Sequence, residues 1–180
     1  EPKCFVKWWF PDHHPAYLER NPGQDWATHV RLGCELFSQV NERLKQAHPG
    51  VAIWLFDETY KETLVVEAAA GIRALDSFGC DGRPWPVSAM RVGGERARKS
   101  LIDEGPRFIA AARAHGARSL ALIETQKLDR ADHAALDRYL PETLAMPWDD
   151  LIYYWYPNNC EDPEGAMAIT LRHLAAARSP

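Results

Sequence analysis

Runs of apolar residues along the chain predict several β-strands. Lys3–Phe10 is rich in residues that favour strands, and Val51–Phe56 is a continuous apolar run typical of a buried strand. Ser119–Ile123 and Leu151–Tyr156 have the same character. Thr63–Ala70 fits two structures, and we interpret it as a strand paired with its predecessor, a helix from Tyr60 to Leu75 being the alternative.

A different spacing predicts a long helix after Asp25, a residue suited to cap it. Apolar residues recur there every three or four positions, which is the period of one helix face. The members of this face are Trp26, Val30, Gly33, Phe37, Val40, Leu44 and Ala47. Leu32 and Leu36 widen the stripe, and Pro49-Gly50 ends the helix.

Capping and breaking residues predict the later helices. They are Glu95–Glu104, a separate helix from Pro106 to His115, Arg130–Leu140 ended by Pro141, and a last helix that begins at Asp162-Pro163 and turns Met167, Leu171 and Leu174 to the core. Ser77–Gly94 is rich in glycine and proline and reads as an irregular exposed segment.

This order of elements predicts an α/β fold, a mixed β-sheet of about five strands flanked by helices. The chain of 180 residues has the length of one domain, so we expect residues 1–180 to form a single globular domain. Neither an internal repeat nor a linker is visible.

Composition narrows the functional classes. With 46% hydrophobic residues and seven tryptophans the chain is unlike a disordered protein, and its apolar runs are too short to cross a membrane. The formal net charge of -4 lacks the basic excess of nucleic-acid-binding proteins. Frequent alanine and arginine indicate a bacterial source, and the sequence slightly favours the cytoplasm over the periplasm.

The four cysteines allow two disulfides but include no CxxC motif. Cys4 and Cys34 fall in a predicted strand and helix, where we expect buried thiols. Cys80 and Cys160 fall in predicted loops and are the better candidates for pairing.

One local cluster could bind a divalent metal. Asp12, His13 and His14 follow the first strand, and carboxylate and imidazole groups are common metal ligands. They define an alternative function, a small metal-dependent hydrolase or phosphodiesterase. His29 lies beside the apolar stripe of the long helix, so we interpret it as a structural residue.

Carboxylates near lysines suggest a second metal-dependent chemistry, that of a nuclease. Asp57, Glu58 and Lys61 form one candidate set, and Glu124 with Lys127 forms another. The three-residue spacing of the second set does not place both side chains on one face of a strand. Salt bridges or solvated strand ends explain both sets more simply.

Recognition of a protein partner explains the aromatic and acidic residues better than catalysis does. The chain has more aromatic side chains than one core needs, and acidic residues lie near them; such surfaces bind basic proteins. The predicted partner-binding residues are Asp57, Glu58, Trp85, Trp148, Asp149, Asp150, Tyr154 and Tyr156. We therefore predict a non-catalytic bacterial binding protein of the immunity or antitoxin type, which inhibits a basic partner enzyme and needs neither cofactor, nucleic acid nor membrane.

Overall fold

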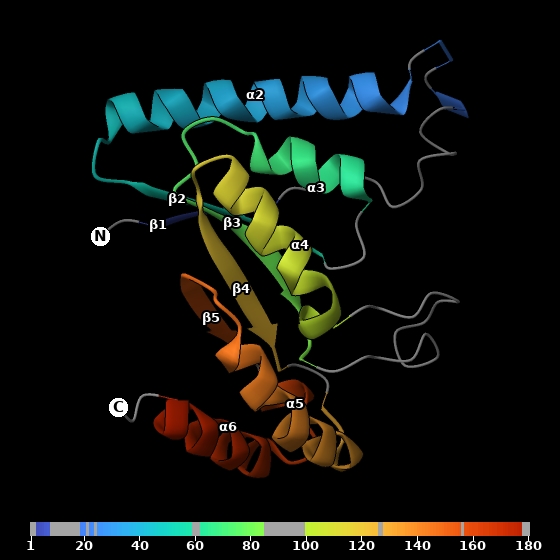
Figure 1. Ribbon diagram of the computed structural model, residues 1–180, viewed down its shortest axis with the longest axis vertical. Coiled ribbons are helices and arrows are strands. Elements are labelled where there is room, and N and C mark those ends of the chain that lie inside the picture. The colour runs from blue at the N-terminus through green and yellow to red at the C-terminus, as the bar shows by residue number, and fades with distance from the viewer. Residues whose placement is uncertain are drawn as a thin grey trace.

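In the described part of the chain, five parallel strands alternate with five α-helices (Figure 1). The computed structural model describes residues 3–7, 19–20, 22–23, 25–58, 62–84, 100–125, 128–155 and 157–177. The strands are β1 (Lys3–Lys7), β2 (Ala52–Glu58), β3 (Ser77–Gly82), β4 (Arg118–Glu124) and β5 (Asp150–Tyr154). The helices are α2 (Trp26–Ala47), α3 (Thr63–Ala70), α4 (Leu101–Ala114), α5 (His133–Ala145) and α6 (Pro163–Ala177), with short 3-10 turns at Arg130–Asp132 and Pro157–Asn159.

The strands form one sheet in the order β1-β2-β3-β4-β5, and every neighbouring pair is parallel. The α/β class and the sheet flanked by helices are confirmed, but the expectation of a mixed sheet is wrong. Thr63–Ala70 is helix α3, which buries Val65, Val66 and Ala69 at helical spacing. A parallel pair needs such a crossover, whereas the predicted hairpin would have made the sheet mixed.

Strand β3 was also missed, because its sequence SFGCDG has the composition of a loop. It lies at the centre of the sheet, where Gly79 is needed for close approach. A Cβ added at Gly79 would lie 1.6 Å from the carbonyl oxygen of Leu120 on β4. Close packing between strands therefore selects a residue with low strand propensity.

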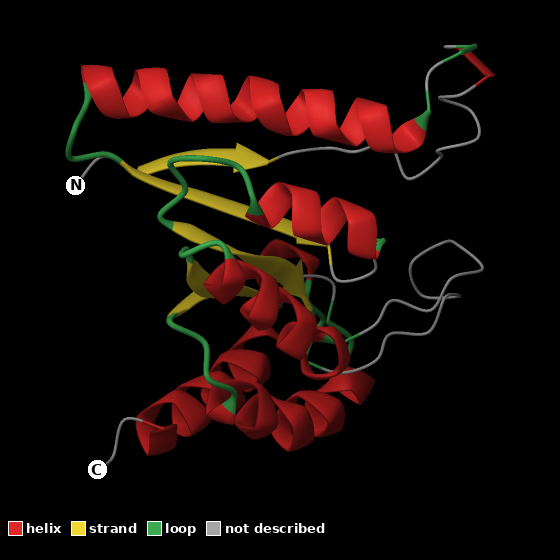
Figure 2. Cartoon of the chain, turned by 45° about the horizontal axis from the view of Figure 1, so that its top comes forward, coloured by secondary structure: helices red, strands yellow, loops and turns green. Residues whose placement is uncertain are grey.

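All five helices pack on one face of the sheet (Figure 2). Residues at the same register position of parallel strands share a face, as Leu55 and Phe78 do, and as Ile123 and Tyr153 do. These side chains belong to one hydrophobic cluster that includes members of α2, α3, α4, α5 and α6. An example is Phe108 of α4, whose ring stacks on Phe78 at 5.8 Å between centroids.

Helix α2 has the predicted extent, and its cap is confirmed because the Asp25 carboxylate accepts a hydrogen bond from Thr28 N at 2.8 Å. The predicted apolar face is partly wrong. Trp26 and Val30 are buried, whereas Val40 is 42% exposed. The buried side of α2 instead includes two polar residues, Ser38 and Asn41.

The sequence predicts a helix boundary at each of two prolines, but both prolines lie inside helices. Pro106 lies inside α4, and Pro141 lies inside α5, which starts at His133. Each helix keeps a continuous apolar face on both sides of its proline, and burial of that face outweighs the lost backbone hydrogen bond. In α6 the predicted start is confirmed, but Leu171 is 57% exposed and does not face the core.

Candidate functional site

The carboxyl ends of the strands meet at one edge of the sheet, because all five strands are parallel. We call this the carboxyl edge and define it by Asp57 and Glu58 of β2, Asp81 of β3, Glu124 of β4 and Tyr154 of β5. Ligands of open α/β sheets bind outside the carboxyl ends of the strands. The arrangement of four carboxylates here is therefore the first candidate for a functional site.

The strand register sorts these residues onto two faces. Glu58 is paired with Asp81, and Glu124 is paired with Tyr154. Asp81 is also paired with Leu122, two residues before Glu124, so four of the five residues lie on the face opposite the helices, and Asp57 lies on the helix side. Neighbouring strands are about 4.8 Å apart, which places Glu58 and Asp81 side by side.

The same face presents aromatic side chains near the carboxyl edge. Phe56 precedes Glu58 by two positions on β2 and is half-buried, whereas the half-buried Trp54 lies nearer the amino ends of the strands, in register with Ser77. Tyr154 is 42% exposed at the end of β5. Flat apolar rings beside carboxylates can bind a ligand that has both hydroxyl groups and apolar faces.

Asp57 is paired with Cys80 and therefore points to the helix side, where α4 packs on β3 and β4. Four charged residues act on the Cys80 thiol: its neighbour Asp81 on the other face of β3, and Arg107, Glu104 and Asp57. Burial is the main cause of the raised pKa of the Cys80 thiol, and the neighbouring Asp81 raises it further, whereas Arg107 opposes the shift. Cys80 is therefore a protonated thiol, unsuited to nucleophilic catalysis.

Arg107 supplies the positive charge at this end of the sheet. Its guanidinium forms an ion pair with Glu104 at 2.6 Å between Nη2 and Oε2 and lies over the Phe108 ring at 5.3 Å. Both partners of the ion pair are largely buried, so the pair is weakly screened by solvent. Positive charge thus lies behind the carboxylates, on the helix side.

Two of the carboxylates are buried, Asp57 at 6% exposed and Asp81 at 7%. Burial of a charged group costs free energy, even where partners offset part of it. Neither carboxylate is needed to fill an apolar core position. We interpret this cost as a sign that the carboxyl edge has a role other than stability.

Hydrogen bonds fix the ends of β4 and β5 beside the site. The Thr125 backbone N–H donates to the Tyr154 carbonyl oxygen at 3.1 Å, and the Thr125 hydroxyl donates to the same oxygen. The Cys160 thiol donates to the Thr125 carbonyl oxygen at 3.2 Å, and the Tyr153 hydroxyl bonds to the hydroxyl of Thr170 on α6. Glu124 and Tyr154 therefore have a rigid support.

Other predicted partner-binding residues lie at the opposite edge of the sheet, which we call the amino edge. Asp149 accepts hydrogen bonds from Ser119 N and Oγ, both at 2.8 Å. Asp150 forms an ion pair with Arg118 at 2.9 Å and accepts from the Ser77 hydroxyl at 2.7 Å. These interactions attach the start of β5 to β4 and β3, so both aspartates are structural residues.

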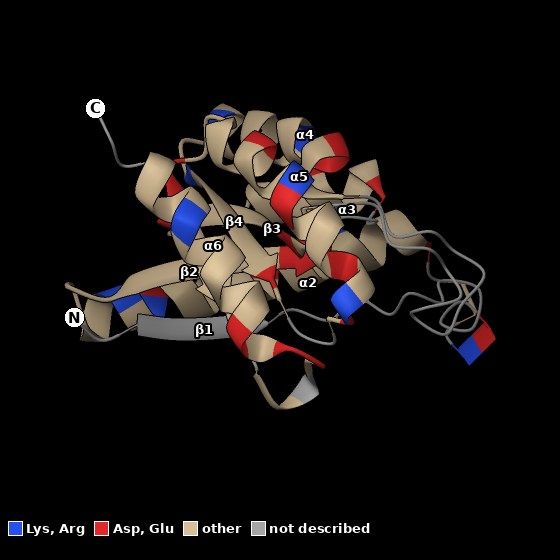
Figure 3. Ribbon diagram, turned by 90° about the horizontal axis from the view of Figure 1, so that it is seen from below, with Lys and Arg blue, Asp and Glu red and all other residues tan. Residues whose placement is uncertain are grey.

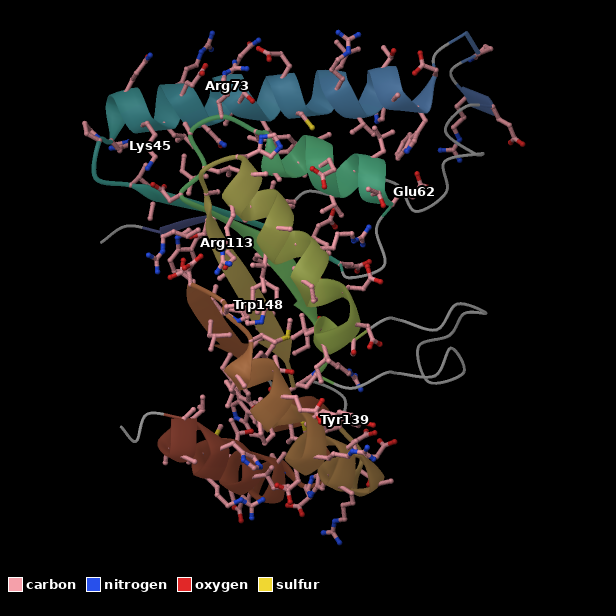
Figure 4. All side chains as sticks on the ribbon, viewed as in Figure 1. Lys45, Glu62, Arg73, Arg113, Tyr139 and Trp148 are labelled. Carbon is pink, nitrogen blue, oxygen red and sulfur yellow. The ribbon has the colours of Figure 1, made fainter. Side chains whose placement is uncertain are left out.

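Trp148 precedes them and packs against α4 (Figure 4). A Cβ added at Gly105 of α4 would lie 2.7 Å from Cζ2 of Trp148, so the glycine makes room for the ring. The eight predicted binding residues therefore do not form one surface. Asp57, Glu58 and Tyr154 lie at the carboxyl edge, Trp148, Asp149 and Asp150 at the amino edge, and Trp85 and Tyr156 lie outside the described residues.

The predicted metal ligands Asp12, His13 and His14 also lie outside the described residues, as do Lys61 and Lys127 of the nuclease sets. Within the described ranges, no three His, Cys, Asp or Glu side chains are placed to hold a metal ion. Cys34, Cys80 and Cys160 are free thiols, so Cys80 and Cys160, the better candidates for pairing, do not form a disulfide. Cys80 is in β3 rather than in a loop.

Asp81 is the site residue that sequence reasoning missed. In the sequence SFGCDG, Asp81 lies near the end of the segment. It can be recognised as an acidic residue at the carboxyl end of a strand only if this segment is assigned as a strand. Figure 3 shows the distribution of acidic and basic positions over the strands and helices.

Comparison of the chain with family models, with curated proteins and with solved structures finds no match. Among the helices that the structure describes, none is both long enough and apolar enough to cross a membrane.

Proposed function

We propose that the protein is a hydrolase that acts at the carboxyl edge through paired carboxylates. The observation that carries this proposal is the placement of Glu58, Asp81 and Glu124 on one face, at the ends of three neighbouring strands. The alternative function predicted from the sequence was also a hydrolase. Its residues Asp12, His13 and His14 lie outside the described residues and do not enter this proposal.

Two carboxyl groups on neighbouring strands suit acid–base hydrolysis of a glycoside-like bond. One protonated carboxyl group donates its proton to the leaving oxygen, and a second, ionised carboxylate activates water or attacks the reacting carbon. Asp81 is central in this scheme, because Glu58 lies beside it on β2 and Glu124 lies diagonally across from it on β4. The diagonal separation of such strand positions is about 7–8 Å.

The surroundings favour a neutral substrate rich in hydroxyl groups. Several carboxylates on one face repel phosphates and other anions, whereas they accept hydrogen bonds from hydroxyl groups. Phe56 and Tyr154 offer aromatic surfaces on the same face. Aromatic rings pack against the apolar faces of sugar rings, so we propose oligosaccharides or glycosides as the substrate class.

The test is hydrolysis of a panel of nitrophenyl glycosides and plant and bacterial polysaccharides, followed by product analysis. Asp81→Asn and Glu124→Gln should each reduce the rate by 100-fold or more, the order of magnitude of one acid–base group (about 10²–10⁴). Glu142→Gln, at an exposed position of α5, is the matched control and should keep the wild-type rate. Wild-type rates in both site variants would contradict the proposal.

Addition of a chelator, and then of Mn²⁺ or Zn²⁺, distinguishes the two kinds of hydrolase. A rate that is independent of metal supports catalysis by carboxylates alone. Loss of activity with the chelator, together with bound metal in protein purified without a histidine tag, would instead support the metal-dependent hydrolase of Asp12, His13 and His14.

A second candidate is the binding protein predicted from the sequence, an immunity- or antitoxin-type inhibitor of a basic enzyme. It is favoured by the exposure of Tyr154 beside acidic residues at the carboxyl edge. Glu58→Lys combined with Tyr154→Ala should abolish capture of such a partner, whereas Glu142→Lys should not. Mutation of Asp149 or Asp150 is a poor test, because these residues hold β5 in place.

A further inference from the structure

Helix α2 is long but contributes little to the apolar core. Four of its 22 residues are buried, and two of these, Ser38 and Asn41, are polar. Helix α4 has only 14 residues, and seven of them are buried. A small cavity also remains beneath α2, lined by Phe37 and by Ile53 and Leu55 of β2. Because burial of an apolar face supplies most of the stability of a helix in a protein, packing alone holds α2 weakly.

Ion pairs attach α2 to the segment that connects α3 to β3. Arg73 of this segment pairs with two glutamates of α2: its Nη1 lies 2.8 Å from Oε2 of Glu35, and its Nε lies 2.7 Å from Oε1 of Glu42. Nearer the end of the helix, Nζ of Lys45 lies 2.6 Å from Oδ2 of Asp76. Figure 4 labels Arg73 and Lys45. We call these three ion pairs the clamp.

The two buried polar residues of α2 bind the same segment. The Arg73 backbone N–H donates to the Ser38 hydroxyl at 3.1 Å, and the Asn41 side-chain amide donates to the Arg73 carbonyl oxygen at 3.1 Å. Residues three or four positions apart lie on one side of a helix, as the polar residues of α2 in these contacts do. The second half of α2 is therefore attached mainly through polar groups on both partners.

The Arg73 ion pairs are sensitive to salt rather than to pH near neutrality. Hydrogen bonds from the Arg73 guanidinium lower the pKa of Glu35 to about 2, so this carboxylate stays ionised at neutral pH. The side chains of Arg73 and Glu35 are 50% and 48% exposed, so dissolved ions reach the pair and screen it. Ionic strength is therefore the condition that weakens the clamp.

We propose that α2 is a strap that detaches from the rest of the fold without global unfolding, and that ionic strength controls how often it does so. When salt screens the clamp, few buried apolar groups remain to hold the helix. Detachment uncovers the side of α3 on which α2 packs. Helix α4 stays in place, because its buried residues remain packed on β3 and β4. The proposal does not depend on the proposed hydrolase activity.

Two thiols distinguish detachment of α2 from unfolding of the whole chain. Cys34 of α2 is half-buried against the core, and burial raises the pKa of its thiol to about 12. Cys80 is fully buried in β3, on which α4 packs. Labelling with iodoacetamide, an uncharged reagent, followed by peptide mapping measures the reaction rate of each thiol separately.

Salt should change the labelling of one thiol only. An increase in KCl from about 0.1 M to about 1 M shortens the Debye length from about 10 Å to about 3 Å. It should raise the labelling rate of Cys34 about five- to ten-fold, the effect of screening two or three exposed ion pairs. Cys80 should stay protected at both concentrations, with an unchanged far-ultraviolet circular dichroism spectrum.

Variants of the clamp test the assigned cause. Arg73→Ala should label at Cys34 in low salt about as fast as the wild type does in high salt, and most of the salt dependence should be lost. Glu42→Gln removes one ion pair of Arg73 and should give an intermediate rate. Arg172→Ala is the matched control: it removes an ion pair of similar exposure on α6 and should leave the labelling of Cys34 unchanged.

Three results would overturn the proposal. Equal labelling rates of Cys34 and Cys80 would mean that α2 opens only when the whole chain unfolds. A rate at Cys34 that does not depend on salt would mean that the clamp does not control the helix. Equal rates at Cys34 in Arg73→Ala and Arg172→Ala would mean the same.

Discussion

The two edges of the sheet use the same residue type in opposite ways. At the amino edge, the carboxylates of Asp76, Asp149 and Asp150 accept hydrogen bonds from backbone and side-chain groups of neighbouring elements. They connect strands and helices and are structural. At the carboxyl edge, Glu58, Asp81 and Glu124 gather on one face at the ends of neighbouring strands.

This difference shows why an acidic residue cannot be assigned a role from its type alone. A carboxylate that accepts several hydrogen bonds from its own fold stabilises that fold. A carboxylate that lies beside other carboxylates is also subject to repulsion from them. Mutations at the amino edge should therefore reduce stability, and mutations at the carboxyl edge should reduce activity.

The largest effect on stability is expected at Asp76. Its carboxylate accepts a hydrogen bond from Ile53 N at 2.6 Å and forms an ion pair with Lys45 of α2 at 2.6 Å. Asp76→Ala should lower the free energy of unfolding by about 2–3 kcal/mol, a typical value for hydrogen bonds to a charged group, moderated by partial exposure of the pair. Urea denaturation measures this loss.

Glu142→Ala serves as the control for this mutation, because Glu142 is exposed on α5. Its effect should stay within about 0.5 kcal/mol, the usual range for surface substitutions. An equally small effect of Asp76→Ala would mean that the amino edge does not hold α2 to the sheet.

How much the sequence reveals also differs between the regions. Helix α2 was predicted with its cap at Asp25, because the periodicity of its apolar residues and its capping residue are local signals. The α/β class followed from the alternation of elements. The parallel order of the strands did not, because it depends on whether Thr63–Ala70 is a strand or a helix, and eight apolar residues fit both.

The candidate site was only partly predictable for the same reason. Asp57, Glu58 and Tyr154 were recognised as functional candidates, because the sequence has many aromatic residues with acidic residues near them. Asp81 was hidden in a central strand whose sequence is set by the close approach at Gly79 rather than by strand propensity. That Asp149 and Asp150 belong to another edge follows from the three-dimensional partners Ser119 and Arg118, which the sequence does not reveal.

A loss of stability of intermediate size is expected at low pH, and it arises from the aspartates at the amino edge. Hydrogen bonds from Ser119 lower the pKa of Asp149 below its ordinary value of 3.8, and the Arg118 guanidinium does the same for Asp150. A folded pKa below the unfolded pKa adds stability above the unfolded value. That stability is lost as the pH falls below 3.8 and through the folded pKa.

Thermal unfolding across this acidic range measures the effect. Asp149→Asn keeps a hydrogen-bond acceptor but removes the titrating group, so the melting temperature of this variant should fall less steeply with acid than that of the wild type. Glu142→Gln should leave the slope unchanged. An identical slope for Asp149→Asn and the wild type would show that Asp149 does not contribute to acid unfolding.

The smallest effect on stability is expected at the carboxyl edge itself. Glu124→Gln keeps the size and the hydrogen-bonding groups of the side chain and removes one negative charge from a face that also includes Glu58 and Asp81. Less repulsion offsets any lost interaction of the charge, so the free energy of unfolding should change by less than about 0.5 kcal/mol. Urea denaturation of Glu124→Gln and Asp76→Ala under the same conditions compares the two edges directly. A loss of stability at Glu124 as large as that at Asp76 would mean that this carboxylate is also structural, and the contrast between the two edges would no longer hold.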